Sequence, residues 1–303
     1  MREEWDVKQV PSQPGNVAIV TGANNGIGYE TALELARKGL AVVLACRDMR
    51  KAEAAKARIL QAYAPAQVNC LELDVSSLRA VREFAAQIHR RHGRLDLLVN
   101  NAGIMMPPYA VSEDGFELQL ATNYLGHFAL TGLLLPLLNG TPGSRVVCVS
   151  SLSYKWAEID FADLQAQQGY SRRKAYGQSK RACLVFAYEL QRRLAAAKCS
   201  TLSVAAHPGL SKTNLDQYFP ALIRPLGSLF LQPAAQGALP LLYAALAPGI
   251  RGGEFIGPDG FQQMRGYPTR VDSDDSSKDQ RVGKRLWKAS EELTDCFYLS
   301  AEA

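Results

Sequence analysis

The sequence lacks the cysteine patterns of metal-binding and disulfide-stapled proteins. Its six cysteines include no C-x-x-C pair, and none lies near a histidine at the spacing of metal ligands. Cys46, Cys70 and Cys148 instead fall within apolar runs, where a thiol behaves as a small hydrophobic group. We therefore expect no metal site, and we expect the chain to work in a reducing compartment.

Long hydrophobic segments are also absent. The most apolar stretch, LGHFALTGLLLPLL, falls short of the ~20 residues that a membrane span needs, and Pro136 interrupts it. The N-terminal residues MREEWDVKQVPSQPG have no apolar core of the kind found in signal peptides. These absences favour a soluble, cytoplasmic protein without a transmembrane segment.

The charge of the chain is only weakly biased, with a formal net charge of +5. Basic residues form short clusters such as RRHGR and SRRK, which we interpret as solvated helix faces, so no nucleic-acid partner is expected. The 303 residues are 47% hydrophobic and show no internal repeat or low-complexity linker. They are predicted to form a single globular domain.

Short apolar runs alternate with longer helical runs along most of the chain. The apolar runs are nearly continuous, as in parallel strands that are covered on both faces. This rhythm predicts an α/β fold, a single-domain Rossmann-type doubly wound parallel sheet with helices on both faces and ligands at the carboxyl ends of its strands. The strand candidates are residues 17–22, 41–47, 68–73, 95–101, 145–151 and 201–207.

Two segments depart from this rhythm. The segment at about 211–235 contains the apolar, proline-rich run DQYFPALIRPLGSLFLQP, which fits either a substrate lid or a buried structural helix pair. The segment at about 275–295 places Val282, Leu286 and Leu293 on one helical stripe. It is predicted to be a C-terminal docking helix without a chemical role.

The first strand candidate ends in TGANNGIG, with Gly22, Gly26 and Gly28 directly before a helical run. Glycines at these positions permit a tight turn and let the backbone approach a pyrophosphate, whose charge is favoured at a helix N-terminus. The location of the turn, after a strand and before a helix, predicts dinucleotide binding.

Together with this turn, six further motifs occur in an order that resembles the short-chain dehydrogenase/reductase family. They are Asp74-Val75, NNAG at 100–103, Asn123, Ser151, Tyr176 with Lys180, and Pro208-Gly209 with Thr213. The resemblance covers about residues 15–260 and implies about seven strands in the order 3-2-1-4-5-6-7. The runs LACRD, ATNYLGHFALTGLLLP and VAAHPGLSKTNL are most similar to the retinol-dehydrogenase branch and its bacterial relatives. The run GGEFIGPDGFQQMRGYP is similar to uncharacterised bacterial members of the family, but it implies no catalytic role.

The resemblance implies a catalytic group of Asn123, Ser151, Tyr176 and Lys180. Tyr176 would exchange a proton with the substrate oxygen, and Ser151 would hydrogen-bond that oxygen. Asn123 would keep a helix locally open so that a water connects Lys180 to solvent. Tyr176 and Lys180 lie one helical turn apart. A lysine charge ~5 Å from the phenol, at an effective dielectric of ~20, contributes roughly 3 kcal/mol, or about two pKa units, to phenol ionisation.

Several neighbouring residues receive other interpretations. Ser150 is a rival to Ser151, although the family pattern favours the second serine. Gly177, Gln178 and Ser179 are interpreted as spacers. His207, which ends an apolar strand, is more typical of a packed, hydrogen-bonded residue than of a base. His127 lies on a helical run without an evident partner.

The residues that the resemblance implies for cofactor binding lie in the same motifs. They are Gly22, Asn24, Asn25, Gly26, Ile27, Gly28, Arg47, Asp74, Val75, Asn101, Ala102, Gly103, Tyr176, Lys180, Pro208, Gly209, Leu210 and Thr213. NADP(H) is favoured over NAD(H). In the family's register the acid of NAD-dependent members would fall at Cys46, whereas Arg47 takes the place of the phosphate-binding arginine and precedes Asp48.

We therefore predict an NADP-dependent oxidoreductase that moves a hydride between the nicotinamide and a carbonyl or alcohol carbon of a small molecule. The apolar residues 219–231 favour a lipophilic or bulky substrate. Two alternatives are a catalytically silent dinucleotide-binding sensor or scaffold, and a protochlorophyllide-reductase-like double-bond reductase. The resemblance also implies a homodimer or homotetramer, through helices around 113–138 and 170–197.

Overall fold

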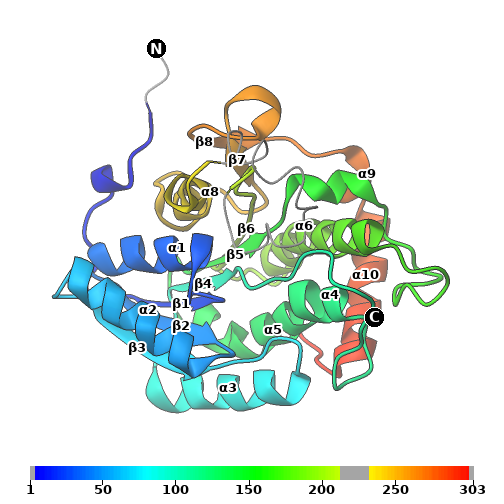
Figure 1. Cartoon of the computed structure of the whole chain (residues 1–303), viewed down its shortest axis with the longest axis horizontal. Coiled ribbons are helices and arrows are strands. Elements are labelled where there is room, and N and C mark those ends of the chain that lie inside the picture. Colours follow the sequence, from blue (N-terminus) through cyan, green and yellow to red (C-terminus); the bar gives the residue numbers. More distant parts are fainter. Residues whose placement is uncertain (1–3, 212–231, 300–303) are drawn as a thin grey trace.

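The structure is a computed structural model that describes residues 4–211 and 232–299. Its centre is an eight-stranded sheet in the order β3-β2-β1-β4-β5-β6-β7-β8 (Figure 1). The strands are β1 Val17–Thr21, β2 Ala41–Cys46, β3 Gln67–Glu72, β4 Leu97–Asn100, β5 Arg145–Val149, β6 Leu202–Ala206, β7 Phe255–Pro258 and β8 Pro268–Val271. The doubly wound parallel sheet and its seven-strand order are confirmed. The expected lid lies almost entirely outside the described residues.

An eighth strand, β8, is added to the predicted sheet. It runs antiparallel to β7, from Phe255 opposite Val271 to Pro258 opposite Pro268. Its four residues, PTRV, begin with a proline and are too few to establish a two-residue period. A strand of this kind fits at a sheet edge, where a missing backbone N–H is tolerated.

Helices cover both faces of the sheet (Figure 1). The helices α1 Gly26–Arg37, α2 Met49–Ala62 and α8 Ala234–Leu246 share one apolar core with one face. The helices α3 Leu78–Arg91, α5 Gly126–Asn139, α6 Arg172–Ala196 and α10 Gln280–Thr294 share a second core with the other. The shorter elements are α4 Leu118–Leu120, α9 Asp275–Lys278, the 3-10 helices Val7–Gln9, Leu152–Trp156 and Phe261–Gln263, and a π-helical segment Ala121–Leu125.

The central strands are buried on both faces because each faces helices on both sides. In β1, Val17 and Ile19 belong to one core, whereas Ala18 and Val20 belong to the other. This assignment follows the two-residue period of a strand. Among the described residues, every helix is too short or too polar to cross a bilayer, and no group of three or more His, Cys, Asp or Glu residues could hold a metal ion.

The C-terminal segment packs along α5 and α6 (Figure 1). The Trp287 ring of α10 lies 5.1 Å from the Phe128 ring and 5.9 Å from the Phe186 ring, measured between centroids. Tyr298 follows, with its ring 4.8 Å from Trp287 and its hydroxyl donating to the Phe128 carbonyl at 3.0 Å. Part of the surface of α5 and α6 is therefore covered by this chain itself and is closed to a second subunit.

Trp287 should anchor this segment. Its side chain is only 1% exposed, and replacing it with alanine removes a large apolar side chain from the second core. We expect Trp287→Ala to lower the free energy of unfolding by about 3–5 kcal/mol, measured by urea titration. Phe297→Ala, at a side chain that is 64% exposed in the same segment, is the control and should change it by less than about 1 kcal/mol. Equal effects of the two substitutions would show that α10 is not anchored through Trp287.

Candidate active site

The glycine turn after β1 packs directly on the loop after β4. Gly22 and Gly26 adopt the left-handed backbone conformation, with φ of 67° and 55°. A Cβ atom at Gly22 would lie 2.9 Å from the Ala102 Cα, and one at Gly28 would lie 2.6 Å from the Gly22 carbonyl oxygen. Only glycine fits these contacts, so the turn leaves its backbone close to the N-terminus of α1. Of the other turn residues, Asn25 precedes α1 at its N-cap, Asn24 is half-buried and Ile27 is buried.

Thr21 joins this turn to the loop at 101–102. Its buried hydroxyl oxygen accepts from the backbone N–H groups of Asn101 and Ala102, both at 2.9 Å. The Asn101 side-chain amide donates back to the Thr21 carbonyl at 2.7 Å. The loop ends of β1 and β4 are therefore fixed to each other by three hydrogen bonds.

The buried His127 continues this connection, although no partner for it was predicted from the sequence. Its Nδ1 lies 3.1 Å from the Asn123 carbonyl oxygen and its Nε2 lies 2.9 Å from the Thr21 hydroxyl. Because a carbonyl can only accept, Nδ1 carries the proton and Nε2 accepts from Thr21. The neutral ring thus links the 101–102 loop to α5 and the π-helical segment.

Asn123 lies in the π-helical segment and clamps the chain after Gly103. Its side-chain oxygen accepts from the Ile104 N–H at 2.8 Å, and its side-chain nitrogen donates to the Ile104 carbonyl at 3.0 Å. The same nitrogen donates to the Ser179 hydroxyl of α6 at 2.8 Å. π-Helical turns are frequent at functional sites.

Tyr176 and Lys180 share α6, which begins after the N-cap Ser171. Both side chains are buried, at 5% and 6% exposure. The Lys180 ammonium donates to the Val149 carbonyl at the end of β5, at 3.1 Å, and a Cβ atom on Gly103 would lie 3.5 Å from it. The Tyr176 ring lies 6.1 Å from the Trp156 ring. The fold thus brings α6, the end of β5 and the loop after β4 together.

The two serines after β5 have different environments. Ser150 is buried and its hydroxyl donates to the Lys180 carbonyl at 2.7 Å. Ser151 is partly exposed, caps the following 3-10 helix and is 3.2 Å from the Ser153 hydroxyl. The geometry therefore leaves Ser151, rather than Ser150, available to a ligand.

The residues between Tyr176 and Lys180 are more than spacers, which corrects the sequence interpretation. A Cβ atom on Gly177 would lie 2.9 Å from the Trp156 Cβ, so glycine is required for close packing. The Gln178 amide accepts from the Asp160 N–H at 2.8 Å and donates to the Leu164 carbonyl at 3.1 Å. Ser179, besides its bond with Asn123, donates to the Tyr176 carbonyl at 2.8 Å. The contacts of Gly177 and Gln178 hold the chain after Ser151 against α6, and Ser179 holds Asn123 there.

The ends of β2 and β3 carry the charged residues considered for the cofactor. The Arg47 side chain is 73% exposed, with its guanidinium 3.6 Å from the Asp74 carboxylate. Asp48 instead caps α2 by accepting a hydrogen bond from the Lys51 N–H at 3.1 Å. This bond, together with the Lys51 and Arg50 charges, lowers the pKa of Asp48.

Cys46 and Val75, at the ends of the same strands, are buried. Burial raises the pKa of the Cys46 thiol to about 11, although hydrogen bonds from the Ala23 and Asn24 N–H groups act to lower it. Val75 is buried beside α5, where Gly126 leaves room for the Val75 carbonyl.

The loop after β6 is held by residues far along the chain. Gly209 has φ of 64°, the Leu210 N–H donates to the Met264 carbonyl at 2.7 Å, and the Gln232 amide donates to the Pro208 carbonyl at 2.7 Å. Thr213 lies outside the described residues.

A cavity of about 400 Å³ lies beside the loop after β6. It is lined by Leu152, Lys155, Leu210, Gln262, Gln263 and Met264. No role at the site was predicted for the run containing FQQM, because that run indicated only similarity to bacterial relatives.

His207 is confirmed as a packed, hydrogen-bonded residue. Its Nδ1 accepts from the Gly209 N–H at 3.2 Å, so its Nε2 carries the proton and donates to the Gln263 side-chain oxygen at 3.0 Å. Its ring lies 5.1 Å from Phe255. His207 therefore links the loop after β6 to Gln263 through its two ring nitrogens.

Together, the open parallel sheet and the glycine turn before α1 define a dinucleotide-binding fold. The family model of short chain dehydrogenases matches residues 16–221. The chain belongs to this family.

Curated relatives place the chain beside the retinol dehydrogenases within the family. Retinol dehydrogenase 13 of Homo sapiens is 41% identical over 292 residues, covering 92% of this chain and 85% of the relative. Polyprenol dehydrogenase of Mus musculus is 39% identical over 304 residues, covering 97% and 88%. An uncharacterised protein of Mycobacterium paratuberculosis, known as a crystal structure, is 42% identical with a TM-score of 0.82, covering 97% of this chain and 98% of its own.

The two buried histidines should make the fold sensitive to mild acid. Burial lowers the pKa of His127 and of His207 from 6.5 to about 4. As the pH falls below about 6.5, the unfolded chain binds these protons first, so stability is lost until the pH reaches about 4. Each histidine should remove about 2 kcal/mol from the free energy of unfolding between pH 7 and pH 5. Urea titrations at both pH values test this.

Glutamine variants separate this contribution from that of other groups. His127→Gln and His207→Gln each remove one titrating ring, so each should reduce the loss between pH 7 and pH 5 by about 2 kcal/mol. The same pH dependence in the unmodified protein and in both variants would contradict the assignment.

Proposed function

We propose that this protein is an NADP-dependent oxidoreductase that transfers a hydride between the nicotinamide and a carbonyl or alcohol carbon, with Tyr176 as general acid and base. The observation that carries the proposal is the convergence of α6, the end of β5 and the loop after β4 around Lys180. Lys180 bonds the Val149 carbonyl and Ser150 bonds the Lys180 carbonyl, which leaves Ser151 on the open side.

The residues present fit a dinucleotide cofactor. The turn from Gly22 to Gly28 has no room for Cβ atoms at its first and last glycines and would hold the pyrophosphate with its backbone N–H groups. Asp74 and Val75 would contact the adenine, and Lys180 would hold the nicotinamide ribose. When bound, the nicotinamide would supply or accept the hydride.

The chain itself would supply the proton and the orientation. Tyr176 would give its proton to the carbonyl oxygen in reduction and take the alcohol proton in oxidation. Ser151 would hydrogen-bond the same oxygen and hold it near the phenol. Asn123 is proposed to support this arrangement by fixing Ile104 and Ser179 on either side of the site.

The substrate is proposed to be a lipophilic alcohol or its carbonyl counterpart. The cavity next to the 3-10 helix that Ser151 caps is lined by the apolar residues Leu152, Leu210 and Met264 as well as by polar ones. Relatives named for retinol and polyprenol, both lipophilic alcohols, support the same class.

The preference for NADP(H) rests on the end of β2. An acid at the position of Cys46 would repel a 2′-phosphate, but the residue there is an uncharged, buried thiol. Asp48 is engaged as the N-cap of α2, whereas the Arg47 guanidinium is largely exposed. Arg47 is therefore free to exchange its 3.6 Å contact with Asp74 for a phosphate.

The hydroxyl of Tyr176 tests the mechanism. We expect Tyr176→Phe to lower kcat at least about a hundredfold while the Kd for NADPH stays within about twofold, because only the proton-transferring group is lost. The measurements are NADPH absorbance loss with a panel of lipophilic carbonyls and NADPH binding by fluorescence. Tyr243→Phe is the matched control, because Tyr243 lies on α8 against Trp5, and it should change neither value.

Turnover in Tyr176→Phe equal to that of the unmodified protein would refute the mechanism. Tight NADPH binding without turnover in the unmodified protein would favour a sensor.

Arg47 tests the cofactor preference. Arg47→Ala should raise the Kd for NADPH about tenfold or more and leave the Kd for NADH nearly unchanged, because the charged contact involves only the 2′-phosphate. Arg79→Ala is a suitable control, since Arg79 is 68% exposed and also pairs with a carboxylate. Equal affinities of the unmodified protein for NADPH and NADH would overturn the preference.

A further inference from the structure

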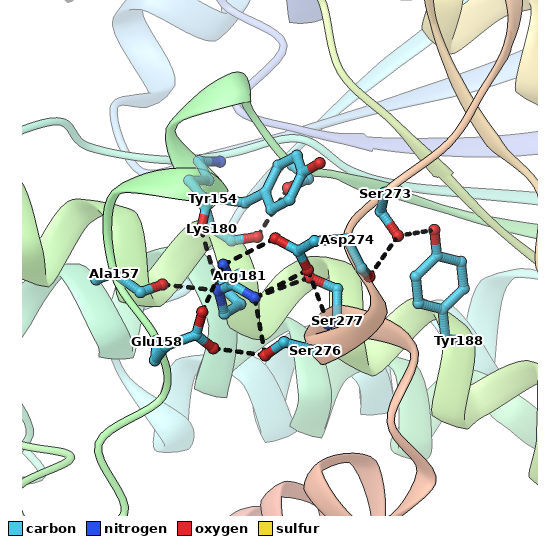
Figure 2. Close-up of polar contacts among 11 residues, drawn as sticks. Tyr154, Ala157, Glu158, Lys180, Arg181, Tyr188, Ser273, Asp274, Ser276 and Ser277 are labelled. Carbon is cyan, nitrogen blue, oxygen red and sulfur yellow. Dashed lines mark hydrogen bonds and ion pairs between the residues drawn. The ribbon is translucent and has the colours of Figure 1, made fainter.

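Arg181, the residue after Lys180 on α6, is a buried cation surrounded by acceptors (Figure 2). Its side chain is 3% exposed. An isolated charge at such a position would be very costly, so its partners are a condition of the fold. Those partners come from two segments, one directly after Ser151 and one near the C-terminus.

The first segment is the 3-10 helix Leu152–Trp156 with the residues that follow it. The Arg181 Nε donates to the Tyr154 carbonyl at 3.1 Å and to the Ala157 carbonyl at 2.7 Å. Glu158 adds an ion pair at 3.1 Å from the guanidinium. Since Ser151 caps this 3-10 helix, Arg181 ties the backbone that carries Ser151 to the helix that carries Tyr176.

The second segment contains Asp274, which binds Arg181 through both oxygens. The two Arg181 terminal nitrogens donate to Oδ1 and Oδ2, each at 3.0 Å, which is the strong bidentate arrangement. Ser276 and Ser277 accept from the same guanidinium at 3.2 and 3.1 Å. Figure 2 shows Asp274, Ser276 and Ser277 gathered on one side of Arg181, with Ala157 and Glu158 on another.

Asp274 is itself fixed in place. It is the N-cap of α9 and accepts from the Ser277 N–H at 2.9 Å. Burial raises the pKa of its carboxyl, but hydrogen bonds from Ser277 and Arg181 outweigh this, so that the pKa lies below its ordinary value. The carboxylate is therefore charged at neutral pH and complements the buried guanidinium.

We infer that Arg181 and Asp274 are positioning residues that set the location of Ser151 relative to Tyr176, which makes the C-terminal residues 274–277 a working part of the active site. The inference rests on the proposed function. When the charge of Asp274 is removed, the Arg181 guanidinium remains a buried cation but has lost its bidentate partner. We expect the guanidinium to move away from the Tyr154 and Ala157 carbonyls toward solvent. The 3-10 helix after Ser151 then loses the two hydrogen bonds through which Arg181 holds its backbone to α6.

The chain offers a matched pair of variants. Asp274 and Asp279 are both helix N-caps, of α9 and α10, and both pair with an arginine. Arg181 is buried, however, whereas the Arg281 side chain is 92% exposed. Asparagine caps a helix about as well as aspartate, so Asp274→Asn and Asp279→Asn preserve both caps and differ in which arginine loses its charge partner.

Hydrogen exchange and steady-state kinetics together test the inference. In Asp274→Asn we expect the backbone amides of residues 152–157 to exchange at least about tenfold faster and kcat to fall at least about tenfold. The Kd for NADPH should stay within about twofold. Asp279→Asn should leave all three quantities unchanged. Arg181→Lys, which keeps the charge but not the bidentate geometry, should resemble Asp274→Asn.

The outcomes separate this inference from the proposed function. Unchanged exchange at 152–157 in Asp274→Asn overturns the anchoring, and faster exchange with unchanged kcat overturns the positioning role. A lower Tm with normal kcat measured well below it would likewise show a purely structural pair. No turnover of any carbonyl or alcohol by the unmodified protein overturns the proposed function, and the exchange comparison then decides the anchoring alone.

Discussion

Two adjacent buried cations on α6 impose the constraint on which the rest of the site depends. Lys180 and Arg181 are each removed from water, so each must be given acceptors by the surrounding backbone. Lys180 takes the Val149 carbonyl at the end of β5, and Arg181 takes two carbonyls after Ser151 together with Asp274. Because consecutive helical residues point about 100° apart, one helix contacts the carboxyl end of β5 and the C-terminal segment simultaneously.

A second, smaller network gives the cofactor side of the site its shape. The Thr21 hydroxyl accepts from two N–H groups of the loop after β4 and donates to His127, whose other nitrogen donates to the Asn123 carbonyl. Because the Asn123 carbonyl can only accept, Nδ1 carries the proton of the neutral ring, and the tautomer of His127 follows from this contact. The carboxyl ends of β1 and β4 are thereby joined to α5, and Asn123 joins the π-helical segment before α5 to α6.

The sequence predicted the sheet and the main site segments because their signals are local. Strand runs, the glycine spacing and the four-residue step from Tyr176 to Lys180 are all visible within short windows. The supports of the site are not local. Asp274 lies 93 residues from Arg181, and His127 lies 106 residues from Thr21. No period or spacing reports such contacts, and so His127 lacked a partner, Gln178 and Ser179 were interpreted as spacers, and the FQQM run received no role.

The middle of α6 is buried on all sides. Every residue from Ala175 to Ala187 is buried, so this part of the helix has no solvent face against which an apolar stripe could be recognised. A helix buried on all sides can carry Gln178, Ser179, Lys180 and Arg181 only if each polar side chain finds a partner. Those partners lie at the end of β5, in the π-helical segment, in the chain after Ser151 and in residues 274–277, so fold stability and the geometry proposed for catalysis depend on the same contacts. A chain that kept Tyr176 and Lys180 but lost the partners of Arg181 would retain the motif without the arrangement that makes it useful.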